Sequence, residues 1–167
     1  MANYELPFGK TLAGWEGGIV KGWQLNAVDV WQTGFPFSVV NASPRSNTGA
    51  GSDRPNLIAD PVLSNPTTHA WFNTTAFQAQ PLGTVGSEAR DAVYGPHFRH
   101  LDLSLFKTFP IKERLRLEAR AESFNLTNTP NFSQPNATLG TASFGTISST
   151  RTGSTPRQLQ FALRLMF

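Results

Sequence analysis

The sequence predicts an all-β fold, an antiparallel up-and-down meander whose strands are joined by irregular loops of very unequal length. Several segments alternate strictly between apolar and polar residues, which is the period of a strand. Phe dominates the aromatic residues with 13 copies, and 14 Gly and 12 Pro supply turns between strands. Charged residues make up only 15% of the chain, against about a quarter in soluble domains. Together these observations favour strands over packed helices.

The N-terminal part predicts the end of one strand and the whole of another. Residues 4–8 look like the tail of a strand, and residues 9–21 form a modest loop rich in Gly. Residues 22–40 form the next strand, in which Trp23 opens an apolar face that slips to the other side at Val28. A β-bulge accounts for such a slip, as does a strand that leaves a bilayer part way.

Residues 99–109 predict a strand with one interruption. The leucines from Leu101 to Leu105 share one face and alternate with polar residues. Lys107 breaks the apolar face near the strand end, where a long side chain can snorkel to a membrane interface. Residues 109–113 then form a tight turn to the next strand.

Residues 113–124 predict a strand despite a composition that suits a helix. Arg, Leu, Glu and Ala are all good helix formers, but a helix would scatter the charges around its circumference and leave no apolar face. Strict alternation therefore decides for a strand. Its charged residues share one face: Arg114, Arg116, Glu118, Arg120 and Glu122. Because arginines accompany both glutamates, we expect these charges to line a polar lumen and pair across neighbouring strands, rather than to form an acid–base pair.

Residues 157–167 show the clearest alternation in the chain. One face is uniformly apolar and the other mostly polar, whereas a helix would mix polar residues into the apolar stripe. The apolar face holds Leu159, Phe161, Leu163, Leu165 and Phe167. We expect this set to face lipid, and we expect Arg164, on the opposite face, to join the lumen-facing residues.

Short and long connections alternate along the chain. Residues 41–98 and 125–156 are long, polar and rich in Gly and Pro, while the other connections are short. Bacterial outer-membrane barrels have short periplasmic turns and longer extracellular loops, and a strand of about ten residues crosses the bilayer core. The pattern therefore predicts an incomplete part of a transmembrane β-barrel in a bacterial outer membrane, with both long loops extracellular. We expect these loops to look disordered.

The composition and motifs argue against chemistry in this chain. Without cysteine there is no disulfide, thiolate zinc site or cysteine nucleophile. The net charge of +3 comes from scattered Lys and Arg, so we expect no nucleic-acid partner. His100 and Asp102 would share a strand face, but His97 points away from them, so we expect no metal site. No serine elbow, phosphate loop or nucleotide fingerprint appears. We therefore expect no enzyme, no catalytic residues and no cofactor.

Several motifs together resemble the C-terminal end of TonB-dependent outer-membrane receptors. They are residues 4–9 (YELPFG), 22–25 (GWQL), 33–37 (TGFPF), 94–96 (YGP), 101–107 (LDLSLFK), 120–132 (RAESFNLTNTPNF) and 156–163 (PRQLQFAL). The match is strongest to the Oar-like subgroup, whose members carry a carboxypeptidase-regulatory-like domain before the plug. The resemblance covers nearly the whole chain.

The resemblance implies a role in ligand uptake through a plugged barrel of roughly twenty-two strands. A plug, a TonB-contacting segment and a signal peptide are not recognisable here, and four strands are fewer than the roughly eight that close a barrel. We therefore expect a fragment of a longer receptor, which would contact TonB only through a missing plug. The terminal Phe167 resembles the signal read by the outer-membrane assembly machinery, so that machinery and outer-membrane lipid are the expected partners, with an unknown ligand.

The long loop over residues 41–98 is the expected place of ligand capture, because loops on a rigid scaffold carry recognition. Its candidate residues are Trp71, Phe72, Phe77 and Arg54. The alternative is a soluble β-sandwich binding module, for example a carbohydrate-binding domain, in which the apolar face packs against a second sheet. That alternative leaves the alternation of short and long connections without an explanation.

Overall fold

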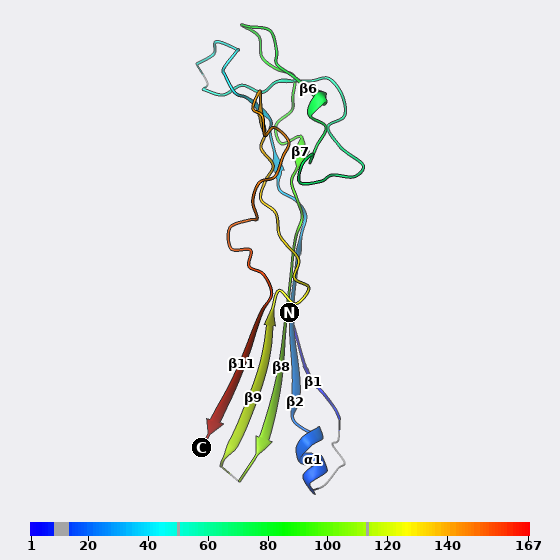
Figure 1. The fold of residues 1–167 in the computed structure, drawn as a ribbon, viewed down its shortest axis with the longest axis vertical. Helices are drawn as coiled ribbons and strands as arrows, with labels where there is room; N and C mark the ends of the chain where they lie inside the picture. The colour runs from blue at the N-terminus through cyan, green and yellow to red at the C-terminus, as the bar shows by residue number, and fades with distance from the viewer. Residues whose placement is uncertain (9–13, 50, 113) are drawn as a thin grey trace. The chain divides into compact units, whose positions relative to one another are not determined.

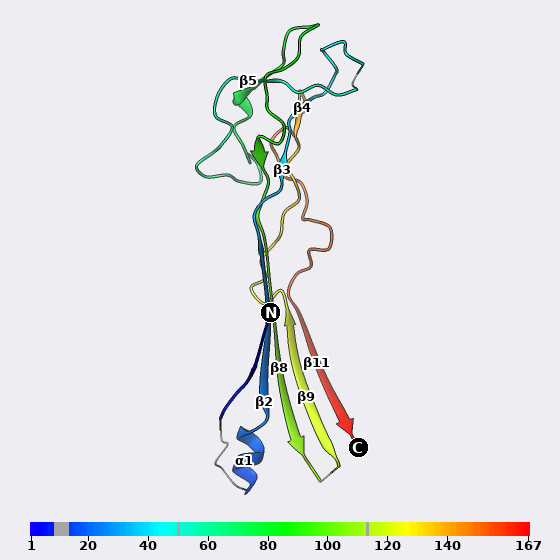
Figure 2. The same ribbon diagram turned by 180° about the vertical axis from the view of Figure 1, so that it is seen from behind.

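The computed structural model describes residues 1–8, 14–49, 51–112 and 114–167. It divides into two compact units, each built from segments that lie far apart in the sequence (Figures 1 and 2). Unit 1 comprises Met1–Trp31, Arg99–Pro130 and Thr155–Phe167, and unit 2 comprises Gln32–Phe98 and Asn131–Ser154.

Unit 1 is an antiparallel sheet in the order β1-β2-β8-β9-β11. The strands are β1 (Ala2–Glu5), β2 (Trp23–Gln32), β8 (Phe98–Pro110), β9 (Arg116–Phe124) and β11 (Gln158–Met166). The Thr108 N–H donates to the Gly22 carbonyl, so that the start of β2 lies opposite the end of β8. The sheet is open and follows the predicted meander, in which chain neighbours are sheet neighbours.

The last three predicted strands are confirmed, and the prediction for residues 22–40 is wrong in its extent. β2 ends at Gln32, and the following chain pairs in unit 2, where β3 (Pro36–Phe37) lies beside β7 (Val93–Tyr94). Pro36 has no N–H to give to a continuing ladder. The strand predicted from residue 113 begins at Arg116, because the Leu115 N–H closes a turn on the Lys112 carbonyl. Glu113 itself lies outside the described residues.

The predicted loop over residues 9–21 holds a short helix in its second half. Helix α1 (Gly14–Val20) precedes β2, while residues 9–13 lie outside the described residues. Three of the seven residues of α1 are glycines, which are poor helix formers, so local propensity does not predict it. Its support comes from β2 and β8, as described below. The described helices include none long and apolar enough to cross a bilayer.

Unit 2 consists of the two long connections, which fold together. Their backbone is mostly irregular, as predicted, with two-residue pairs β5 (Asn56–Leu57) with β6 (Phe77–Gln78) and β10 (Thr138–Leu139) with β4 (Val40–Asn41). The parallel β10–β4 pair joins one connection to the other. A single 3₁₀ turn, η1 (Thr74–Ala76), precedes β6.

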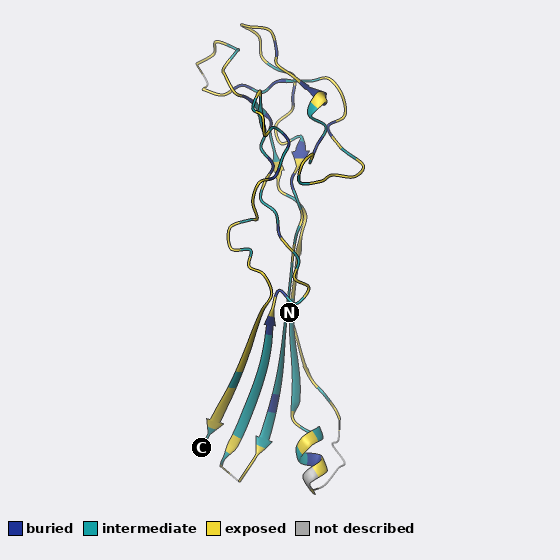
Figure 3. Cartoon of the chain, viewed as in Figure 1, coloured by how far each residue is buried: buried dark blue, intermediate teal, exposed yellow. Residues whose placement is uncertain are grey.

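The core of unit 2 is aromatic, and it corrects the expectation that the loops look disordered. Its buried residues are Val39, Phe72, Ala76, Phe77 and Val93, packed against Phe37, Leu57, Trp71, Leu139 and Phe144. The ring of Phe72 lies 5.6 Å from that of Phe77 and 5.2 Å from that of Phe144, both edge to face. Figure 3 colours buried residues dark blue, and dark blue segments occur in unit 2. Both connections contribute rings, so neither packs alone.

Candidate functional site

The sheet of unit 1 has two chemically different faces. Strand register places Leu105 beside Ala121 and Ala121 beside Phe161, so that one apolar row crosses β8, β9 and β11. Every second row repeats this character, except where Lys107 on β8 and Ser123 on β9 replace apolar residues. The predicted apolar set of β11 is Leu159, Phe161, Leu163 and Leu165, and each of these residues is more than half exposed; Phe167 follows the strand and is also exposed. An exposed apolar surface of this size is typical of a face that contacts lipid or another apolar surface.

The opposite face carries the charges predicted to line a lumen. Arg116, Glu118, Arg120 and Glu122 all lie in β9, Arg164 lies beside Glu118 in β11, and Arg114 stands exposed just before β9. Arg120 forms an ion pair with Glu118 on the same strand, and its guanidinium lies 5.0 Å from the ring of Phe106 on β8. The pairing that we expected across strands is therefore found within β9 for these two residues.

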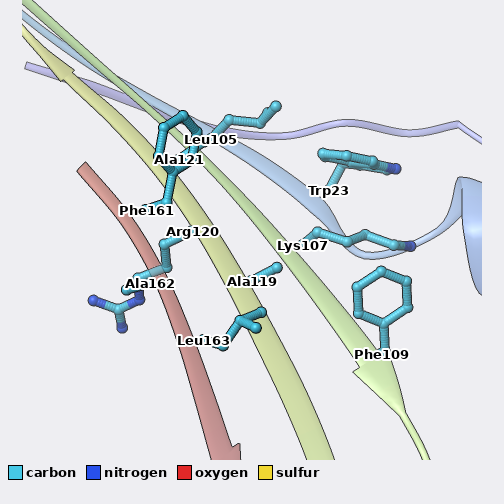
Figure 4. Close-up of a pocket in the computed structure, with 10 residues that line it drawn as sticks. All are labelled: Trp23, Leu105, Lys107, Phe109, Ala119, Arg120, Ala121, Phe161, Ala162 and Leu163. Atoms are coloured by element: carbon cyan, nitrogen blue, oxygen red, sulfur yellow. The ribbon is translucent and has the colours of Figure 1, made fainter. Parts of the chain in front are cut away.

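Lys107 is the one charged residue on the apolar side of the β8–β9–β11 rows, and the structure corrects its predicted role. Rather than snorkelling, its side chain is 2% exposed. Its ammonium donates to the Gly18 carbonyl at 2.8 Å and to the Lys21 carbonyl, at the C-terminal end of α1. Figure 4 shows the side chain between the rings of Trp23 and Phe109, whose centroids lie 5.5 and 4.9 Å from the ammonium.

This arrangement explains both the helix and the lysine. The last carbonyls of a helix lack partners and carry partial negative charge, so a cation there is favourable. Two aromatic faces add cation–π attraction, which is stronger away from water. The Trp23 indole also donates to the Ile19 carbonyl at 3.0 Å, which ties α1 to the start of β2. The carbonyls at the end of α1 thus provide hydrogen-bond acceptors for a lysine on the apolar face of the sheet, although the sequence of α1 does not predict a helix.

A groove of 520 Å³ lies beside Lys107. Small side chains of β9, Ala119 and Ala121, lie in the same rows as larger side chains on β8 and β11. The remaining lining residues shown in Figure 4 are Trp23, Leu105, Lys107, Phe109, Arg120, Phe161, Ala162 and Leu163. The alternation of the sequence contains these alanines, but only the register shows that they lie between two ridges.

The turn after β9 is held by a buried asparagine. Asn125 has a left-handed backbone with φ of 50° and is 2% exposed. Its amide nitrogen donates to the carbonyls of Thr129 and Thr155, and its side-chain oxygen accepts from the Thr129 N–H at 3.0 Å. Its own N–H donates to Asp102, which also pairs with His100. One side chain therefore joins the end of β9 to the chain that enters β11.

Unit 2 contains a buried carboxylate that is only half satisfied. Glu88 is 2% exposed; one oxygen accepts from the Val39 N–H at 2.9 Å, and the other has no hydrogen-bond partner among the described residues. Burial raises the pKa of Glu88, and the Val39 hydrogen bond and the charge of Arg54 oppose that shift. The Arg54 guanidinium donates to the Glu88 carbonyl at 2.9 Å.

A second carboxylate of unit 2 has the opposite environment. Asp53 accepts hydrogen bonds from the Ser46 hydroxyl and from the N–H groups of Arg45 and Ser46. The Ser46 hydroxyl, followed by these N–H groups, holds the pKa of Asp53 below its usual range. Because the hydrogen bonds favour the charged form, Asp53 orders its own loop.

The residues predicted for ligand capture all make contacts within unit 2. Phe72 and Phe77 belong to the buried core, and Arg54 is bound to the backbone at Glu88. Trp71 is partly exposed, and its indole donates to the Tyr94 carbonyl at 2.9 Å. Sequence position alone could not separate the core aromatic residues of this loop from its surface ones.

The comparison with known families agrees with this two-faced sheet. Residues 1–160 match the family model described as outer membrane beta barrel domain. No curated protein and no solved structure gives a significant match to the chain. The matched residues include all of the first four strands of the sheet and the start of β11. The chain therefore belongs to the outer membrane beta barrel domain family, and its place is the bacterial outer membrane.

Proposed function

We propose that the chain forms part of the wall of a TonB-dependent outer-membrane receptor of the Oar-like subgroup, and that unit 2 takes part in ligand uptake on the extracellular side. The observation that carries this proposal is the folding of both long connections into one unit with a shared core. Loops that serve only to link strands have no need of a common core, whereas a recognition surface needs a fixed shape.

The strand directions support an extracellular place for that unit. In an antiparallel sheet, the β2–β8 and β9–β11 connections leave from the same end, and the β1–β2 and β8–β9 connections leave from the other. Long loops at one end and short ones at the other are the arrangement of bacterial outer-membrane barrels, whose short turns face the periplasm. The motifs over residues 120–132 and 156–163 add the resemblance to TonB-dependent receptors.

The chemistry of the two faces supports a lipid side and a lumen side for the sheet. The exposed leucines and phenylalanines of β11 suit lipid, and the charges of β9 suit a polar lumen. Among the described residues, β1 and β11 each pair along one edge only. An unpaired edge is not tolerated in lipid, so further strands complete the wall in the assembled receptor.

The soluble sandwich is the weaker alternative. It requires a second sheet over the apolar face, yet the described part of the chain places no second sheet on β11, whose apolar residues stay exposed. Membership of an outer-membrane family also counts against it. A folded unit 2 is also what a binding module would have, but the receptor proposal accounts for unit 2 equally well.

The proposal is tested by comparing nutrient phenotypes in the bacterium that encodes the chain. A strain that lacks the gene and a strain that lacks TonB are grown across a panel of single nutrient sources. We expect the gene deletion to impair growth on a subset of the sources that require TonB, and the double mutant to be no worse than the TonB mutant on that subset. A growth defect that adds to the loss of TonB would contradict the receptor assignment.

The role of unit 2 needs a separate comparison. Complementation with a gene in which residues 41–98 are replaced by a short Gly–Ser linker is expected to restore outer-membrane assembly but not growth. The matched control replaces Gly153, which lies in open space, with Asn, a residue that tolerates its left-handed backbone. Full growth with the linker variant would contradict a role of unit 2 in ligand uptake.

A further inference from the structure

We propose that the groove over Ala119 and Ala121 binds one acyl chain of a phospholipid, whose phosphate lies beside Lys112 and Arg114 after β8. This inference rests on the place of the apolar face in lipid, not on the identity of the transported ligand. A barrel wall contacts lipid everywhere, but most of that contact is with a surface that has no preferred position for a chain. The groove supplies such a position.

The shape of the groove comes from a row pattern of large, small and large residues. Ala121 lies between Leu105 on β8 and Phe161 on β11, and Ala119 lies in the next row beside Leu163. Phe161 and Leu163 are each 75% exposed, so they stand above the alanines as a ridge. A volume of 520 Å³ is within the range of ligand sites that are mostly apolar with few polar groups.

The opposite ridge is fixed in place by Lys107. Its ammonium is bound to the carbonyls at the end of α1, and its stem fills the space between Trp23 and Phe109. This ridge is thus stiff, although it contains a lysine. Because two of its three N–H groups are engaged and the side chain is buried, Lys107 acts as a wall of the groove and not as a phosphate ligand.

Basic side chains near one end of the groove favour a lipid with an anionic headgroup. The turn that follows Phe109 carries Lys112 and Arg114, both exposed, next to the exposed apolar Ile111. With Glu113 between them in the sequence, the formal charge of the turn is +1. Basic residues beside an apolar segment attract anionic lipid headgroups. In the proposed orientation this turn faces the periplasm, so the complementary lipid is a phospholipid of the periplasmic leaflet and not the lipopolysaccharide of the outer surface.

The test counts phospholipids that stay with the protein when it is extracted from outer membranes in mild detergent. Ala121→Leu and Ala119→Leu fill the floor of the groove with apolar volume. The matched control is Ala27→Leu, which makes the same change on β2. Ala27 lies on the same strand face as Trp23 but does not line the groove. Native mass spectrometry of the intact complexes gives the number of bound phospholipids, and resistance to heat and detergent shows that each variant is folded.

We expect both groove variants to retain at least threefold less phospholipid than the unmodified protein and Ala27→Leu to retain the same amount. Replacement of Lys112 and Arg114 by Gln is expected to lower the share of anionic phospholipid among what remains. Equal retention by Ala121→Leu and the unmodified protein would overturn the proposal, as would an equal loss in Ala27→Leu. Recovery of lipopolysaccharide instead of phospholipid would overturn the choice of ligand. Nutrient uptake is not expected to change in any of these variants, so failure here leaves the receptor proposal standing.

Discussion

Asn125 and Asn128 form a matched pair for testing how the turn after β9 is held. Both have a left-handed backbone with φ of 50°, so replacing either with Ala introduces the same kind of backbone strain. They differ in what their side chains do. Asn125 is buried and makes three side-chain hydrogen bonds, while Asn128 is exposed and accepts one, from the Arg157 N–H at 3.0 Å.

The difference in hydrogen bonding sets the expected magnitude. Asn125→Ala leaves one N–H and two carbonyls without partners in a largely buried turn, at about 1–3 kcal/mol for each group that stays unsatisfied. Water can replace part of this, so we expect a total loss of roughly 3–6 kcal/mol. Asn128→Ala loses one exposed hydrogen bond, at about 0.5–1.5 kcal/mol. The strain of Ala in the left-handed region, about 1–2 kcal/mol, cancels in the comparison.

The assay is equilibrium unfolding by urea of the receptor assembled in lipid vesicles, followed by tryptophan fluorescence. We expect Asn125→Ala to be less stable than Asn128→Ala by at least 2 kcal/mol, and amide hydrogen exchange to show the loss at the top of β9 and β11. Asn125→Gly, which relieves the strain but still lacks the side chain, is expected to remain less stable than Asn128→Gly. Equal losses for the two alanine variants would refute the assignment of Asn125 as the central contact of this turn.

Three further predictions concern other parts of the chain. Lys107→Met keeps the apolar stem but removes the donors at the end of α1, so amide exchange in α1 should quicken by the equivalent of about 1.5–3 kcal/mol while β9 is unchanged. The pKa of Glu88 is raised in the folded state, so the folded protein holds the Glu88 proton more tightly than the unfolded chain does. The stability that the protonated carboxyl contributes is fully present below the unfolded pKa and is lost as pH rises through the folded pKa. Glu88→Gln should therefore make unit 2 more stable than the unmodified protein at pH 7, and this difference should fade toward about pH 4. Gly34→Ala would place a methyl group 1.8 Å from the Gly95 carbonyl, so it should separate β3 from β7, whereas Gly18→Ala meets open space and should be tolerated; near-ultraviolet circular dichroism checks both.

Alternation in the sequence was enough to predict the sheet where both faces keep their character. β8, β9 and β11 alternate between apolar and polar residues, with exceptions at Phe106, Lys107 and Ser123, and their ends agree with the prediction to within three residues. β2 could not be bounded in the same way, because its apolar residues change face. What ends it is a pairing in unit 2, between Pro36–Phe37 and a segment more than fifty residues further along the chain.

The candidate site was less accessible to sequence reasoning than the strands. The apolar and polar sets of β9 and β11 follow from the period of two, and their lipid and lumen sides stay predictions. The groove needs the register, since Ala119 and Ala121 matter only because large residues lie beside them on both neighbouring strands. Helix α1 and the role of Lys107 depend on contacts between residues some ninety positions apart.

The most direct test of the central claim uses the absence of cysteine from the chain. Leu163→Cys and Arg164→Cys place one thiol on each face of β11, at neighbouring positions of the same strand. In intact outer membranes we expect a water-soluble, membrane-impermeant maleimide to label Arg164→Cys at least tenfold faster than Leu163→Cys, and a lipid-soluble maleimide to reverse that order. Equal labelling of the two positions by both reagents would contradict a strand that faces lipid on one side and a polar lumen on the other.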